Sequence, residues 1–73
     1  MDIRRLVGQN VRLFRSRLGI SQEELAFRSG LHRTYVSGVE RGVRNPTAVI
    51  IDKLAKALDV DAASLLRTKP KTK

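Results

Sequence analysis

The sequence predicts an all-α fold, a compact five-helix bundle formed by residues 1–67. Apolar residues recur every three or four positions through most of the chain, which is the spacing of one face of a helix. No run alternates apolar and polar residues as a half-buried strand would. Hydroxyl or carboxylate side chains precede several periodic segments and glycine follows others, as is typical of helix ends.

The first helix is predicted from about Ile3 to Leu18, and Gly19 ends it. Its apolar stripe consists of Ile3, Leu6, Val7, Val11, Phe14 and Leu18. Ser21 then begins a capping box, since Glu24 follows three residues later. This box predicts the start of a second helix, which runs to about Arg28.

Ser29 and Gly30 predict a tight turn, and a third helix follows from about Arg33 to Arg41. Its inward positions are Val36 and Val39, and Gly42 is its C-terminal stop.

Thr47 is the predicted cap of a fourth helix through about Leu58. Asp61 is the predicted cap of a last short helix, Ala62 to Arg67. Residues 68–73, TKPKTK, lack apolar side chains and are expected to form a basic, disordered tail.

The composition limits the possible partners. Fifteen Lys and Arg against seven Asp and Glu give a net charge of +8, which favours a polyanion such as DNA, RNA or an anionic membrane surface. There is no cysteine, so disulfides and the usual structural zinc sites are excluded. No apolar run reaches the roughly 20 residues of a membrane span, and no signal peptide is evident, so we expect a soluble, cytoplasmic protein.

The second and third helices, joined by a short turn with a glycine, have the arrangement of a helix-turn-helix. Helical hairpins are also common in purely structural bundles, so only the side chains can indicate whether this one binds DNA. Arg33, Thr34 and Ser37 share one outward face of the third helix and can hydrogen-bond to base edges in a DNA major groove. Gly38 follows, where a longer side chain is expected to hold the helix away from the groove.

The segment SQEELAFRSGLHRTYVSGVERGVRNPT, followed by LAKALDV, resembles the lambda-repressor-like (Xre/Cro-type) helix-turn-helix family. The resemblance covers about residues 5–66. Within that family, RTYVSGVER and RNPT are most similar to the controller proteins of restriction–modification systems, which are small dimeric regulators of transcription. The resemblance implies a bacterial or phage protein, associated with the nucleoid.

The resemblance also implies roles for individual residues. Those matching base-contacting positions are Arg33, Thr34 and Ser37, and those matching DNA-backbone contacts are Gln22, Tyr35, Arg44 and Asn45. Arg15 and Glu40 match a structural ion pair. His32 departs from the family, which usually has Ser, Thr or Asp as the cap of the recognition helix. It could be a weak cap or an exposed side chain, donate to a phosphate, or make binding depend on pH.

One recognition helix reads too few base pairs to be selective, so we expect a homodimer on an inverted-repeat operator in double-stranded DNA. Apolar residues of the last two helices are expected to form the dimer interface, namely Ile51, Leu65 and Leu66. Two alternatives remain open. The chain could be an antitoxin or co-regulator whose helices bind a partner protein, or a non-specific nucleic-acid binder that relies on charge.

Catalysis is not expected. His32 lies in an exposed turn rather than between a serine and a carboxylate, and the acidic residues lack metal-ligand spacing. No glycine-rich loop links a strand to a helix to hold a nucleotide. We therefore predict no enzyme activity, no metal, no cofactor, no small-molecule ligand and no membrane partner.

Overall fold

The computed structural model describes residues 2–68, and within that range it contains four α-helices, one short 3-10 helix and no strand. In chain order these elements are α1 (Ile3–Leu18), α2 (Gln22–Ser29), α3 (Arg33–Glu40), α4 (Ala48–Leu58) and η1 (Ala62–Leu66). The predicted all-α class is confirmed. Apart from Thr68, the expected tail lies outside the described residues.

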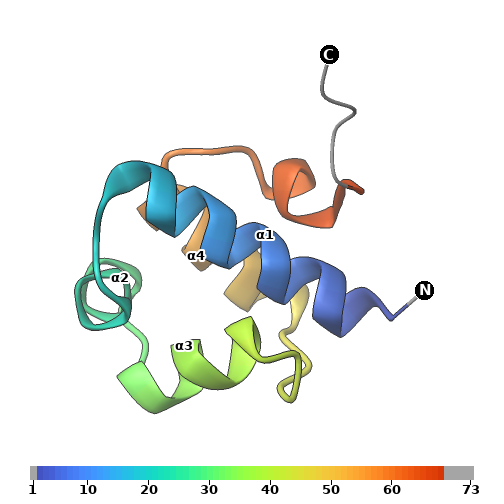
Figure 1. The fold of residues 1–73 in the computed structure, drawn as a ribbon, viewed down its shortest axis with the longest axis horizontal. Coiled ribbons are helices and arrows are strands. Elements are labelled where there is room, and N and C mark those ends of the chain that lie inside the picture. Colours follow the sequence, from blue (N-terminus) through green and yellow to red (C-terminus); the bar gives the residue numbers. More distant parts are fainter. Residues whose placement is uncertain (1, 69–73) are drawn as a thin grey trace.

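The elements are arranged around α1, which runs through the middle of the molecule (Figure 1). In this view α3 and η1 lie on opposite sides of α1, and α4 passes behind it. α2 packs against both α3 and α4. Every element contributes to a single core, whose fully buried side chains are Val7, Val11, Leu25, Val36, Val39, Leu54, Leu58 and Leu65.

Side-chain caps begin three of the α-helices. The Ser21 hydroxyl accepts a hydrogen bond from the Glu24 amide at 2.9 Å, and the Thr47 hydroxyl accepts one from the Ile50 amide at 3.2 Å. Both caps were predicted from the sequence. Asp2 adds a third, since its carboxylate accepts from the Arg4 amide at 3.0 Å. A hydrogen bond from the Arg4 side chain lowers the pKa of Asp2 below its ordinary value.

Left-handed residues end the helices. At the end of α3, Gly42 has a φ of +77°, and its amide donates to the Val39 carbonyl at 3.0 Å. The next amide, Val43, donates to the Gly38 carbonyl at 3.0 Å, which completes a Schellman motif. Gly42 is therefore the stop that the sequence predicted. Asp59 occupies the equivalent place after α4, with a φ of +61°. Among residues 2–68, no other non-glycine residue has a positive φ.

The close approach of α1 to α3 depends on Gly8. A Cβ built on Gly8 would lie 2.8 Å from the Glu40 carbonyl oxygen and would also overlap the Val39 carbonyl. Because both obstacles are backbone atoms, no side-chain rotation could make room for a larger residue. Gly8 thus fixes how near the third helix lies to the centre of the molecule.

The predicted last helix is present, but Asp61 does not cap it as the sequence predicted. Residues Ala62–Leu66 form a 3-10 helix rather than an α-helix, with the Ser64 amide donating three residues back to the Asp61 carbonyl at 2.9 Å. Asp61 stands at the N-cap position, but its side chain makes no capping hydrogen bond. The end of the helix is instead held by Asn10, whose buried Nδ2 donates to the Leu65 and Arg67 carbonyls at 2.9 and 2.8 Å.

Candidate nucleic-acid interface

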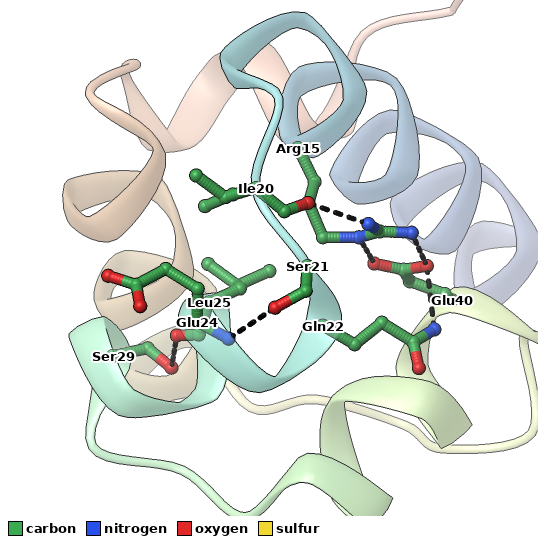
Figure 2. A network of polar contacts seen from close by, with 8 residues as sticks. All are labelled: Arg15, Ile20, Ser21, Gln22, Glu24, Leu25, Ser29 and Glu40. Atoms are coloured by element: carbon green, nitrogen blue, oxygen red, sulfur yellow. Dashed lines mark hydrogen bonds and ion pairs between the residues drawn. The ribbon is translucent and has the colours of Figure 1, made fainter.

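An ion pair between Arg15 and Glu40 connects α1 to the end of α3 (Figure 2). Arg15 Nε donates to Glu40 Oε2 at 2.6 Å, and Nη2 donates to Oε1 at 3.0 Å. The Glu40 side chain is only 3% exposed, so this carboxylate lies inside the protein and does not face a DNA backbone. The hydrogen bonds to Glu40 raise the pKa of Arg15 despite its desolvation. The structure therefore brings together the two residues predicted to pair.

The same network reaches α2. Arg15 Nη1 also donates to the Ile20 carbonyl at 2.9 Å, just before α2 begins. Gln22, the first residue of α2, donates from Nε2 to Glu40 Oε1 at 3.0 Å (Figure 2). One carboxylate thus holds the helix-turn-helix elements and α1 in a fixed relation. The remaining Nε2 hydrogen of Gln22 stays available to an anion near the positive end of the α2 dipole.

The solvent-facing side of α3 carries the three residues predicted to contact bases. Arg33 and Thr34 are exposed and Ser37 is half-buried, while Val36 and Val39 on the opposite side are fully buried. Because the positions lie three and four residues apart, Arg33, Thr34 and Ser37 form one face. We call this set the recognition face. His32 is exposed at the N-cap position and makes no side-chain capping hydrogen bond, so it does not serve as a cap.

The four residues predicted to contact the DNA backbone lie on three different elements. Gln22 begins α2, Tyr35 lies in the first turn of α3, and Arg44 and Asn45 are exposed in the loop that follows α3. The Arg44 guanidinium carbon lies 5.7 Å from the centre of the Tyr35 ring, a distance at which a cation–π interaction forms. Tyr35 and Arg44 are therefore neighbours, although nine positions separate them in the chain.

Two sequence-based expectations need correction. Gly38 is buried, and Arg44 fills the space where a side chain at this position would lie. The glycine therefore does not serve to bring the helix closer to a DNA groove. Leu65 was expected at a dimer interface, yet it is 0% exposed because η1 packs this side chain against α1 and α4. It is a core residue of the single chain. Leu66, at 45% exposure, and the half-buried Ile51 keep surface for a partner.

Sequence reasoning missed the buried side chain of Asn10, which fixes η1 against α1 and therefore shapes the surface near Leu66. The signal was a lone amide inside the apolar stripe of the first helix. It also missed that Val49, the second residue of α4, is 65% exposed. Because Val49 lies two positions before Ile51, it points to a different side of the helix and does not extend the Ile51 surface.

The sequence profile of the family described as Helix-turn-helix matches residues 11–65, which is most of the chain. The chain belongs to the helix-turn-helix family of DNA-binding transcriptional regulators. This confirms the family resemblance read from the sequence.

Relatives of this helix-turn-helix protein include several control proteins. It is 52% identical over 66 residues to control protein C.BamHI of Bacillus amyloliquefaciens, covering 89% of this chain and 82% of that protein. It is 48% identical over 66 residues to control protein C.SmaI of Serratia marcescens, covering 90% and 79% respectively. Among solved structures, the restriction-modification controller protein C.AhdI from Aeromonas hydrophila matches with a TM-score of 0.82 at 53% identity, covering 85% of this chain and 94% of that one.

Residues 2–68 of the helix-turn-helix protein contain neither a candidate metal site nor a candidate membrane span. That range holds no cluster of three or more histidine, cysteine, aspartate or glutamate side chains able to bind a metal ion. In the same range, none of the helices has the length and apolar character needed to cross a bilayer.

Proposed function

We propose that this protein is a sequence-specific regulator of transcription that binds an inverted-repeat operator as a homodimer, in the manner of a restriction–modification controller. The observation that carries the proposal is the recognition face. Arg33, Thr34 and Ser37 present hydrogen-bonding groups to solvent from a helix whose other side is fully buried. Base recognition in a major groove requires a polar helix face that is open to solvent and held in place by the core.

Each residue of the recognition face has a specific chemical role in this proposal. Arg33, the first residue of α3, is placed to donate two hydrogen bonds to O6 and N7 of a guanine. The hydroxyls of Thr34 and Ser37 can donate or accept, and the Thr34 methyl can contact a thymine methyl. These contacts supply selectivity, at about 1–3 kcal/mol for a good bidentate pair.

Affinity for the DNA backbone comes from residues outside the recognition face. Gln22 lies at the N-terminus of α2, where free amides and the helix dipole favour a phosphate. Tyr35 lies on α3, and Arg44 and Asn45 lie in the loop that follows it. Phosphate contacts from α2, α3 and this loop would set the register and orientation of α3 in the groove. The net charge of +8 adds attraction to any DNA.

The homodimer is proposed because one α3 covers too few base pairs for a unique site. Two-fold symmetry would place two copies of α3 in successive major grooves about 34 Å apart. Leu66 on η1 is exposed and Ile51 on α4 is half-buried, and these two elements pack against each other, so their apolar side chains provide surface for this contact. Similarity to C.BamHI, C.SmaI and C.AhdI favours a controller, and we also propose a cytoplasmic, nucleoid-associated location in a bacterium and no catalytic role.

Sequencing of the genomic fragments that the purified protein retains tests this function. We expect a small number of strongly enriched promoter regions that share an inverted repeat, with a restriction endonuclease gene beside one of them. The control is a polypeptide of the same length and net charge but of random sequence, which should retain fragments without preference. Uniform retention of fragments by the protein itself would contradict sequence-specific regulation.

A further inference from the structure

Gly38 is an unusual residue for the interior of a short helix. Glycine costs roughly 1 kcal/mol relative to alanine at such a position, and α3 has only eight residues. The structure shows what the missing side chain makes room for. A Cβ on Gly38 would lie 2.6 Å from Arg44 Cγ, 3.3 Å from Nε and 3.5 Å from Cδ. The aliphatic part of Arg44 therefore lies directly against the Gly38 backbone.

This contact could not be relieved by a small movement of the guanidinium. Cγ is the second carbon of the arginine side chain, so it moves only if the side chain takes a different rotamer near its base. The main chain of Arg44 is also held at Gly38. The Gly38 carbonyl accepts from the Val43 amide at 3.0 Å and from the Arg44 amide at 3.3 Å. An alanine at position 38 would thus redirect the Arg44 side chain while its backbone stayed in place.

The course of the Arg44 side chain across Gly38 determines the position of its guanidinium group. It leads to Tyr35, whose ring centre lies 5.7 Å from the guanidinium carbon. Tyr35 occupies the same helix as the recognition face, between Thr34 and Ser37 in sequence. An arginine free in solvent would lose rotamer freedom on binding a phosphate, whereas one already held against α3 has less to lose.

We propose that Gly38 is a positioning residue for Arg44: its missing side chain lets the arginine lie across α3 and places the guanidinium over Tyr35, where it meets a backbone phosphate beside the groove. The inference rests on the proposed DNA-binding function. In this proposal Gly38 itself does not contact DNA. It also explains why a buried position in the recognition helix is occupied by glycine rather than by a stronger helix former.

The free protein provides the first test, through the NMR chemical shifts of the Arg44 side chain. In the wild type, the Tyr35 ring should shift the Arg44 Hγ and Hδ resonances upfield. In Gly38→Ala this ring-current shift should disappear, because the new methyl group displaces the arginine from the ring. Retention of the shift in a folded Gly38→Ala protein would overturn the proposal, whether or not the protein binds DNA.

The second test compares binding to one selected duplex over a range of salt concentrations. Gly38→Ala and Arg44→Ala should each weaken binding about tenfold, as expected for loss of a charged hydrogen bond. Each should also reduce the salt slope by about one unit while leaving the preference for the selected duplex over random DNA unchanged. Lys56→Ala, which removes a charge from an exposed site on α4, is the control and should change affinity less than twofold.

The double variant Gly38→Ala/Arg44→Ala separates positioning from general helix packing. Without the arginine the new methyl group has room, so the double variant should fold and bind no more weakly than Arg44→Ala alone. A further tenfold loss in the double variant, or a double variant as unfolded as Gly38→Ala, would overturn the proposal. If the wild type shows no preference for any duplex, the DNA-binding function fails, and the NMR test still decides the role of Gly38.

Discussion

Arg33 is the residue on which selectivity is expected to depend most. It is exposed at the first position of α3, and two N–H groups of its guanidinium can donate to O6 and N7 of a guanine. We expect Arg33→Ala to weaken binding to the selected operator by about 1–3 kcal/mol while changing binding to random DNA far less. Fluorescence anisotropy titrations at one fixed salt concentration measure both affinities. An equal loss on both duplexes would show that Arg33 contributes only charge.

The carboxylate of Glu40 matters for stability rather than for contact with DNA. It is nearly inaccessible and receives hydrogen bonds from both Arg15 and Gln22. Glu40→Ala leaves the partly buried Arg15 guanidinium without its partner, and we expect a loss of about 3 kcal/mol in the free energy of unfolding. Urea denaturation followed by circular dichroism measures it.

A double variant, Arg15→Met/Glu40→Leu, is the matched comparison for this ion pair. Apolar side chains of similar size leave no unpaired charge, so the double variant should recover most of the stability lost in Glu40→Ala. A double variant that is less stable than the single one would mean that the ion pair itself, rather than the unpaired arginine, determines the loss.

At the scale of the element, the end of α4 contains backbone strain that a substitution can remove. Asp59 adopts the left-handed conformation that glycine adopts at the ends of α1 and α2. We expect Asp59→Gly to raise the free energy of unfolding by about 0.5–1 kcal/mol, because the Cβ penalty disappears. Thermal unfolding is the measurement, and Asp52→Gly inside the same helix is the control, expected to be destabilising. A lower melting temperature for Asp59→Gly would contradict this explanation.

The helices could be predicted from the sequence because their signals are local. Apolar spacing, the Ser21 and Thr47 caps and the glycine stops lie within a few residues of the helix ends that they determine. The predicted apolar stripe of the first helix is not buried at its two ends, since Ile3 is 53% exposed and Leu18 is 44% exposed. Whether a residue at the end of a helix is covered depends on elements distant in the chain, which apolar spacing does not reveal.

The remaining features depend on contacts that no local pattern encodes. The Asn10 side chain binds carbonyls 55 and 57 positions away, and that bond shapes η1. The burial of Leu65 and the space that Gly38 leaves for Arg44 likewise appear only once the helices are packed. For the candidate site, spacing alone placed Arg33, Thr34 and Ser37 on one face. The contact between Tyr35 and Arg44 could not be read from spacing.

At the scale of the whole molecule, dimerisation should depend on the exposed apolar surface. Leu66 is 45% exposed, so a charge there affects the single chain little and a dimer interface strongly. We expect Leu66→Asp to remain folded but to dissociate into monomers at concentrations where the wild type is dimeric, as measured by sedimentation equilibrium. The control is Ser16→Asp, which adds the same charge at an exposed polar position of α1 and should leave the dimer intact. A wild type that stays monomeric, or a variant as dimeric as the wild type, would exclude this interface.

The central claim is that two copies of the recognition face read one DNA site. Its most direct test is selection of bound duplexes from a pool of random DNA. We predict enrichment of an inverted repeat whose half-sites are centred about ten base pairs apart, bound by two protein chains. Selection of a single half-site bound by one chain, or no enrichment at all, would contradict the claim.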